Sequence, residues 1–305
     1  MLEFQRVCPC QRERFEAYFK GQPEKGCEYS IVNLMAWGRQ RVHFGQTHLI
    51  IFSQFDRASV YPFPVGHGDI KPVLDAILAD AKERGIPCRL TSMTREECDT
   101  LESLYPGRFC FHSDRDGFDY VYSIEALATL RGKRYQSKRN FVNRFRQLRP
   151  NCQTVVLSEE NLTLAHDLLA NWFAQRQERE AGGNFHMEQV ALDRVLRHWT
   201  ALGMEGIVLV DEGQPIAFAI GSRLTEDTFD IHFEKAMDTT DGSYAAINQA
   251  FAAYLMEKYP EVKWLNREDD LGIEGLRNAK LSYKPDRLVE KYWARFWEDD
   301  DEDAD

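Results

Sequence analysis

The order of β and α patterns in the second half of the chain constrains its fold more than any single motif. A β pattern covers residues 151–157, and apolar residues then recur at helical spacing over roughly 159–178 and 187–202. Three β patterns, GIVLVD, PIAFAIGSRL and FDIHFEKAM, are separated by turn signals and predict a meander. We then expect a helix over 243–258, a strand at VKWLN, a short helix over 273–281 and a closing strand at RLVEKYWARF. This order predicts an α+β domain built around a mixed sheet.

The first half repeats a similar organisation with weaker signals. Strands are expected over about 30–36, 40–43, 48–52 and 59–63, followed by a helix over 69–84. The strand CRLTS, a helix over 95–105, and strands around 109 and 120–122 come next. The repeated order predicts two sheets of related topology. The expected divisions are a first domain over 1–130, a linking helix over 131–150, a second domain over 151–297 and a disordered acidic tail over 298–305.

The segment LRGKRYQSKRNFVNRFRQLRP is basic in a chain whose net charge is -11. Phe141, Phe145 and Leu148 recur at helical spacing with Val142 beside them, so an amphipathic helix is expected. The opposite face carries polar donors suited to phosphate or carboxylate, and these are Arg139, Asn143 and Arg146. A solvated surface helix is the alternative.

The remaining composition describes a globular chain of 305 residues with 43% hydrophobic residues. No apolar run approaches the roughly 20 residues that a membrane span requires, and the first residues do not resemble a secretory signal. A cytoplasmic protein is expected. The seven cysteines lack paired CxxC spacing, and Cys8 and Cys10 are too close in sequence for an ordinary disulfide, so reduced thiols are expected. No metal site is predicted, since no His or Cys cluster is visible.

Three segments carry a resemblance to a known family: GKRYQSKRNFVNRF, HFEKAM with the following DGSYAAIN, and NREDDLGIEGLRNAKLSYKPDRLVEKY. They look like the soluble family related to the C-terminal domain of phosphatidylglycerol lysyltransferase, over nearly the whole chain. The resemblance implies two tandem GNAT-like mixed-sheet domains, joined here by the basic helix. It also implies transfer of an aminoacyl group from aminoacyl-tRNA, which membrane-linked relatives deliver to a lipid hydroxyl.

A coenzyme A site is not favoured by the turns that would form it. In acetyl-CoA-using GNAT proteins a glycine-rich turn after the meander binds pyrophosphate at a helix N-terminus. The matching stretch here, MDTTDGSYAAIN, contains Gly242 alone and two aspartates. Gly66, His67 and Gly68 precede a helix in the first half, but Asp69 as a helix cap explains that turn equally well. No cofactor is therefore predicted, and acyl-CoA stays an alternative.

Asp230, His232 and Glu234 alternate along one expected strand, so all three are expected on one face of the sheet. Glu234 or His232 could then accept a proton from an acceptor amine or hydroxyl. An exposed polar face is the alternative. Tyr244 and Asn248, four residues apart on the next helix, could position substrate or serve in capping and packing.

The segment 266–284 holds the densest set of candidates. Asn266, Glu268, Asp269 and Asp270 directly follow the strand VKWLN and could recognise an α-ammonium group. Arg277 and Lys280 follow on a short helix and could hold a phosphate or the departing ribose oxygen. An internal network of ion pairs is the alternative.

The leading hypothesis is a transferase that moves an aminoacyl or acyl group, from aminoacyl-tRNA, to a lipid-linked or small acceptor. Catalysis is assigned to Glu234, His232, Asp269 and Lys280. Substrate binding is assigned to a basic and polar set: Lys133, Lys138, Arg139, Asn143, Arg146, Tyr244, Asn248, Asn266, Glu268, Asp270 and Arg277. The alternatives are an acyl-CoA-dependent N-acyltransferase and a non-catalytic module that binds tRNA or another anion.

Overall fold

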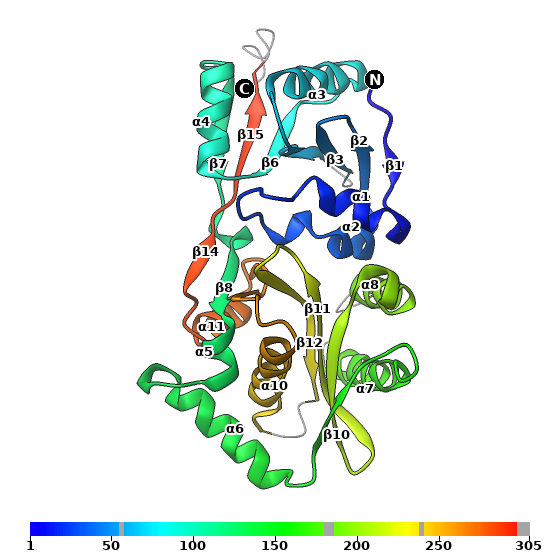
Figure 1. Ribbon diagram of the computed structural model, residues 1–305, viewed down its shortest axis with the longest axis vertical. Helices are drawn as coiled ribbons and strands as arrows, with labels where there is room; N and C mark the ends of the chain where they lie inside the picture. The colour runs from blue at the N-terminus through cyan, green and yellow to red at the C-terminus, as the bar shows by residue number, and fades with distance from the viewer. Residues whose placement is uncertain (55–57, 180–185, 238–240, 298–305) are drawn as a thin grey trace. The chain divides into compact units, whose positions relative to one another are not determined.

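The computed structural model describes residues 1–54, 58–179, 186–237 and 241–297. The chain forms two compact units, Met1–Phe118 with Val289–Asp305, and Asp119–Leu288. Each contains one sheet with helices packed against it (Figure 1). The expected acidic tail, 298–305, lies outside the described residues.

The first unit is built on a sheet whose strands run in the order β1-β2-β3-β4-β6-β15-β7, with β5 paired to β3. Its strands are β1 (Gln5–Arg6), β2 (Gln40–Phe44), β3 (His48–Gln54), β4 (Ser59–Pro62), β5 (Val65–Gly66), β6 (Arg89–Met93), β7 (Phe109–Ser113) and β15 (Tyr292–Phe296). Its helices are η1 (Pro9–Gln11), α1 (Arg12–Ala17), η2 (Cys27–Tyr29), α2 (Ile31–Trp37), α3 (Lys71–Arg84), α4 (Arg95–Leu104) and η3 (Arg115–Gly117). Apolar residues of α3 and α4, among them Ile77 and Leu101, pack with the strands into one core.

Two expectations for the first unit are wrong. Residues 30–36 form helix α2 instead of a strand, because the Ser30 hydroxyl caps it by accepting from Val32 N and Gly38 ends it with a φ of 66°. Cys8 and Cys10 form a disulfide, although reduced thiols were expected. The spacing of residues in the sequence revealed neither the helix at 30–36 nor the disulfide between Cys8 and Cys10.

The second unit is built on a sheet with the strand order β14-β8-β13-β12-β11-β10-β9. Its strands are β8 (Asp119–Ser123), β9 (Gln153–Val156), β10 (Glu205–Asp211), β11 (Gln214–Arg223), β12 (Thr228–Ala236), β13 (Trp264–Asn266) and β14 (Arg287–Val289). Its helices are α5 (Ile124–Thr129), η4 (Lys133–Tyr135), α6 (Gln136–Leu148), α7 (Thr163–Arg179), α8 (His186–Arg197), α9 (Trp199–Leu202), α10 (Ser243–Lys258) and α11 (Glu274–Leu281). The predicted meander β10-β11-β12 is confirmed.

Helices cover both faces of this second sheet. Phe251 and Leu255 of α10 and Leu127 of α5 pack with the strands on one face into a large buried cluster. Helices α7 and α8 lie on the other side of β10–β12 from α10 (Figure 1). Both faces of the central strands are therefore buried, and polar side chains there need specific partners.

The domain boundaries differ from the expected ones. The closing segment 287–296 divides into β14, in the second sheet, and β15, which pairs with both β6 and β7 in the first. β8, expected in the first domain, pairs with β13 in the second sheet. The first boundary falls after residue 118 instead of 130, and α6 lies within the second unit. Local patterns identified these strands, but long-range pairing assigned them to a sheet.

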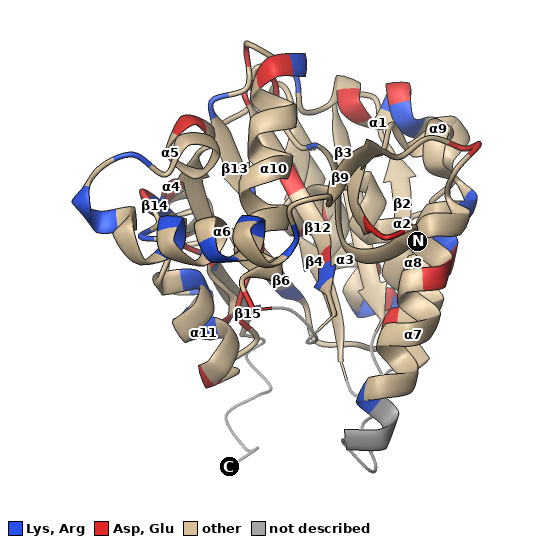
Figure 2. Cartoon of the chain, turned by 90° about the horizontal axis from the view of Figure 1, so that it is seen from below, with Lys and Arg blue, Asp and Glu red and all other residues tan. Residues whose placement is uncertain are grey.

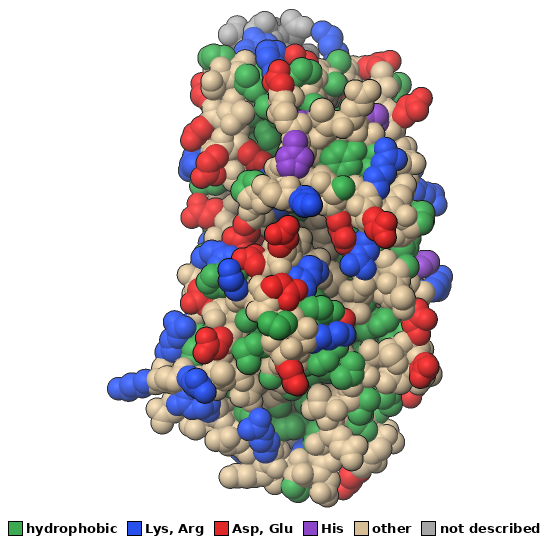
Figure 3. All heavy atoms as spheres, in the orientation of Figure 1, with side chains coloured by type: hydrophobic (Ala, Val, Ile, Leu, Met, Phe, Trp, Pro, Cys, Tyr) green, Lys and Arg blue, Asp and Glu red, His purple; other side chains and the backbone are tan. Residues whose placement is uncertain are grey.

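The basic helix α6 buries a narrower apolar stripe than expected. Val142 and Phe145 are buried, whereas Phe141 and Leu148 are 41% and 54% exposed. Figure 2 marks in blue the Lys and Arg positions along α6 and the segment before it, and Figure 3 shows basic groups on the surface in this region. The helix thus presents both charged and apolar groups to solvent.

Candidate functional site

The strands β12 and β13 pair only over a short stretch and then separate. Their parallel register joins Thr228–Asp230 to Trp264–Asn266. β12 continues to Ala236, while β13 ends at Asn266 and the chain turns into a loop. Candidate side chains from β12 and from this loop therefore meet where the two strands diverge.

A β-bulge in β12 decides which way these side chains point. The register joins Ser222 to Asp230 but Ala219 to Glu234, so β12 has one more residue than β11 over this stretch. Ala219 and Ser222 are three positions apart and point to opposite faces, and Asp230 and Glu234 therefore do so too. The prediction that Asp230, His232 and Glu234 share one face is wrong for Glu234, because strict alternation requires a strand without a bulge.

Glu234 lies on the α10 face and is held from two sides. Its Oε1 lies 3.1 Å from Nη2 of Arg267, and its Oε2 accepts a hydrogen bond of 3.1 Å from Nδ2 of Asn248. Asn248 is buried, and its Oδ1 has no hydrogen-bond partner among the described residues. Nη1 of Arg267 is likewise buried without a hydrogen-bond acceptor in the described part of the chain. Two polar atoms beside Glu234 are therefore available to a ligand.

Lys138 reaches the same face from α6. Its Nζ lies 3.8 Å from the centre of the Tyr283 ring, and the Arg267 guanidinium lies 4.9 Å from that ring. Burial is the largest of the effects that lower the pKa of Lys138 to about 8; the charge of Arg267 adds to it and that of Glu234 opposes it. Lys138 therefore lies close enough to Arg267 and Glu234 to feel both charges.

The other predicted residues of the basic segment serve different purposes. Arg139 donates to the backbone oxygens of Leu130 and Gly132, so it holds the turn before α6. Arg146 donates to Oε1 of Gln249 at 3.2 Å. Lys133 and Asn143 are exposed. Arg139 and Arg146 thus have contacts within the chain, whereas Asn143 is exposed on the same helix.

The opposite face of β12 carries a second polar cluster. Nδ1 of His232 lies 3.2 Å from Oε1 of Glu268 and 3.5 Å from Oδ2 of Asp230. Its Nε2 lies 2.8 Å from Oγ of Ser222 on β11. The side chains of His232 and Asp230 are fully buried, and that of Glu268 is 24% exposed.

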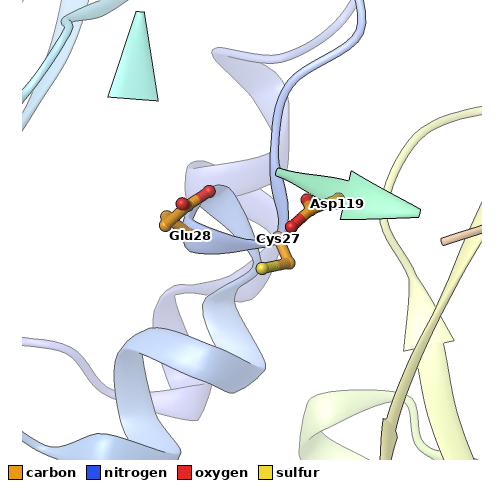
Figure 4. A group of neighbouring side chains, drawn as sticks. All are labelled: Cys27, Glu28 and Asp119. Carbon is orange, nitrogen blue, oxygen red and sulfur yellow. The ribbon is translucent and has the colours of Figure 1, made fainter. Parts of the chain in front are cut away.

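The loop after β13 is fixed by residues that were predicted to bind substrate or to act in catalysis. Asn266 donates to Oδ2 of Asp119 at 3.0 Å and accepts from the backbone N of Glu268 at 2.7 Å. Figure 4 labels Asp119 at the start of β8. Lys280 is buried and donates to the backbone oxygens of Arg267 and Asp269, and burial lowers its pKa. These contacts shape the loop, which is the internal network considered as the alternative.

The buried carboxylate of Asp270, in this loop, pairs with the partly exposed Arg277 of α11. Both carboxylate oxygens of Asp270 accept from Arg277, at 2.8 and 2.9 Å, and Tyr120 Oη donates at 2.5 Å. The hydrogen bonds from Arg277 hold the pKa of Asp270 well below its usual range, with Tyr120 and the backbone N of Gly272 adding to the effect. The pair stabilises the loop conformation.

The turns considered for coenzyme A have other contacts. At Gly242, the N-cap of α10, a Cβ atom would lie 2.4 Å from the backbone oxygen of Phe141, so α6 packs against this helix end. Tyr244 in its first turn is 39% exposed. In the first unit, Asp69 accepts from the backbone N of Lys71 at 3.0 Å, but the N-cap of α3 is Ile70, so the expectation that Asp69 caps this helix is wrong by one residue.

A separate polar group lies in the first unit. Glu28 pairs with Lys291 at 2.6 Å, and Lys291 also donates to Sγ of Cys27 at 3.8 Å. Figure 4 labels Cys27 and Glu28 on η2. Lys291 is buried, so these contacts stabilise the attachment of η2 to the last segment of the unit.

Sequence reasoning missed Arg267, Ser222 and Tyr283. Arg267 follows Asn266 directly and could have been found by including every polar residue after VKWLN. Ser222 and Tyr283 gave no such signal, because their partners lie on other elements.

Comparison with known structures places this fold in a class. A tandem GNAT protein from the clavulanic acid biosynthesis pathway covers 97% of the chain, with 98% of its own length matched, a TM-score of 0.52 and 9% identity. L-PGS from Bacillus licheniformis covers 93%, with 91% of its own length, a TM-score of 0.67 and 19% identity. The fold is therefore that of tandem GNAT-like proteins.

The family of the chain follows from its match to a family model. The family model for phosphatidylglycerol lysyltransferase, C-terminal, matches residues 19–295, and the chain belongs to this family. A conserved protein of unknown function from Bacteroides thetaiotaomicron is 34% identical, with 97% of this chain and 100% of that chain covered and a TM-score of 0.91. Family and fold indicate a transferase of the phosphatidylglycerol lysyltransferase and GNAT-like type.

The chain also resembles a protein whose name states no activity. The uncharacterized protein MYCGA3080 of Mycoplasmoides gallisepticum is 24% identical over 212 residues, which are 67% of this chain. The match spans 63% of that relative's length. Among the described residues, no helix combines the length and apolar character needed to cross a membrane.

Proposed function

We propose that this chain transfers an aminoacyl group from aminoacyl-tRNA to a hydroxyl or amine of a lipid-linked or small acceptor. The observation that carries the proposal is the position of Glu234 between Arg267 and Asn248, beside the Lys138 ammonium. Family membership supports the class of reaction, and the proposed place of action is the cytoplasm.

Glu234 would act as the general base. The acceptor oxygen or nitrogen attacks the ester carbonyl carbon of the donor and gives its proton to Glu234. The new acyl bond forms, the bond to the ribose oxygen breaks, and the proton passes to that oxygen. Because the donor is already an activated ester, positioning and proton transfer are the main requirements.

Arg267 and Lys138 would stabilise the negative charge on the carbonyl oxygen. Nη1 of Arg267 is buried and has an open donor position, and a buried cation interacts strongly with developing charge. Asn248 Oδ1 could accept a hydrogen bond from the acceptor or from the α-ammonium group of the donor. Exposed basic groups near α6, including Lys133 and Arg134, would contact the tRNA backbone.

The contacts of α10 support a donor other than coenzyme A in this unit. The backbone of Phe141 approaches the N-terminus of α10, where GNAT proteins that use acetyl-CoA bind pyrophosphate. An acyl-CoA donor predicts that acetyl-CoA raises the melting temperature, and our proposal predicts no such increase.

The test is transfer of a labelled amino acid from charged bulk tRNA, with phosphatidylglycerol vesicles in one arm and soluble hydroxyl or amine acceptors in the other. Glu234→Gln should lower the rate about 10²- to 10⁴-fold, as expected for loss of a general base. Glu257→Gln, an exposed change on α10, is the matched control and should behave as wild type. Transfer by Glu234→Gln at the wild-type rate would exclude the assigned base, and no transfer to any acceptor would overturn the function.

A further inference from the structure

The cluster on the far side of β12 from Glu234 has no part in the proposed transfer. It brings together three atoms of metal-ligand type, Nδ1 of His232, a carboxylate oxygen of Asp230 and one of Glu268, all within 4.8 Å of one another. Two of the separations are 3.2 and 3.5 Å. Ligand atoms about 2.1 Å from one ion lie about 3.0 to 3.4 Å apart at octahedral to tetrahedral angles. The spacing therefore fits a shared ion.

The second nitrogen of His232 is also placed as in a metal site. Metal-bound histidines usually donate their other N–H to an oxygen, which fixes the tautomer and the ring direction. Nε2 of His232 lies 2.8 Å from Oγ of Ser222, and Ser222 is buried on β11. With Nδ1 bound to a cation, the proton on Nε2 would be donated to this hydroxyl.

The charges of the cluster favour a cation. Two carboxylates face a single imidazole nitrogen, which can direct a proton toward one of them at a time. The buried Lys280 ammonium lies close enough to feel the charge of Glu268, but it donates to the backbone oxygens of Arg267 and Asp269. Asp230 is fully buried, and a cation bound between it and Glu268 would offset the repulsion between their carboxylates.

We propose that Asp230, His232 and Glu268 bind a divalent transition-metal cation, with Ser222 orienting the imidazole. One imidazole and two carboxylates suit Mn²⁺ or Zn²⁺ better than a thiolate-selective metal. The partial exposure of Glu268 leaves one side of the ion to water. The strands hold Asp230 and His232 rigidly, whereas Glu268 comes from the loop that the contacts of Asn266 and Lys280 fix.

The test uses Mn²⁺ alone, because this ion has low affinity for the free cysteine thiols of the chain. The full chain is freed of metal on a chelating resin and titrated with Mn²⁺, and the loss of the free-ion signal is followed by electron paramagnetic resonance. One saturable site is expected, and Zn²⁺ should displace Mn²⁺ from it. No donor or acceptor is present, so the result is independent of the proposed transfer reaction.

Variants separate this site from weak binding by surface acids. His232→Gln and Glu268→Gln should each lower the affinity at least tenfold, and Ser222→Ala about 10- to 100-fold. Glu261→Gln, which removes an exposed carboxylate paired with Arg223, should bind as wild type. Melting curves confirm folding, and Glu268→Gln carries the test if His232→Gln does not fold. Absence of a saturable site, or Mn²⁺ affinity equal to that of the wild type in both His232→Gln and Glu268→Gln, would overturn the proposal and leave adventitious binding only.

Discussion

Oε1 of Glu234 lies 3.1 Å from Nη2 of Arg267, and both side chains are nearly buried, with 12% and 13% exposed. Each side chain offsets the cost of burying the charge of the other. Glu234 lies on β12 beyond its pairing with β13, and Arg267 directly follows the end of β13. The pair is thus both a structural element of the second unit and the centre of the proposed chemistry.

Replacing one partner should destabilise the protein more than replacing both. Arg267→Met leaves Glu234 without its cation, and we expect the free energy of unfolding to fall by about 3 kcal/mol. The double variant Arg267→Met with Glu234→Gln should recover part of this loss. Urea unfolding of the two single variants and the double variant measures the coupling, and strictly additive losses would show that the pair does not interact.

The pKa of Lys138 predicts a pH-dependent stability. Its folded-state pKa of about 8 lies below the ordinary lysine value of 10.5, so between these values the unfolded state binds more protons. Stability should therefore rise with pH from 8 to about 10.4, by up to about 3 kcal/mol from this residue. Lys138→Met should lose this rise, while Lys133→Met, exposed in the same segment, should keep it. Parallel urea midpoints for all three proteins are the measurement, and identical pH profiles would refute the assignment.

The ion pair between buried Asp270 and Arg277 should stabilise the protein most at neutral pH. Asp270→Asn removes a carboxylate that accepts from Arg277 and Tyr120, and a loss of about 2 to 4 kcal/mol is expected. The folded-state pKa of Asp270 is depressed, so the stabilisation is present above the unfolded value of about 3.9 and disappears as pH falls below it. Thermal melting at pH 7 and pH 3 should show the difference between wild type and Asp270→Asn shrinking in acid. A constant difference would contradict the prediction.

Residues of the basic segment should divide into two groups. Lys133→Glu with Arg134→Glu should weaken tRNA binding and reduce its salt dependence, because both residues are exposed. Arg139→Ala should instead lower stability by about 1 to 3 kcal/mol, since it leaves the carbonyls of Leu130 and Gly132 without their cationic donor. Filter binding across a salt series, with melting temperatures of each variant, separates the two effects. A loss of tRNA affinity in folded Arg139→Ala equal to that of the charge reversal would return Arg139 to the binding surface.

Much of the local structure could be predicted from the sequence because helix and strand patterns depend on neighbouring residues. The helix 243–258 and the meander that precedes it were expected where they occur. Where the local structure differs from the expectation, the cause is a local contact that the spacing of apolar residues does not indicate. Residues 30–36 form a helix because of the Ser30 cap and the end at Gly38.

The candidate site could be predicted in part. Glu234 and Asn248 were expected near substrate, and Lys138 was expected in an anion site; the structure brings these three residues together around Arg267, and their roles stay predictions. Asp270 lies in the loop after β13 and pairs with Arg277 of α11, and Lys280 of α11 donates to the backbone of that loop. Charge alone does not distinguish a residue that binds substrate from one that holds a loop.

The sequence by itself determined the order of the elements, the family and the residues able to carry charge near the site. Tertiary structure decided which sheet each strand joins, as when β15 enters the first sheet between β6 and β7. It also decided that Glu234 and His232 point to opposite faces, because the bulge in β12 appears only in its pairing with β11. Pairing register is a relation between distant segments, and a one-residue change in it reverses every side chain that follows.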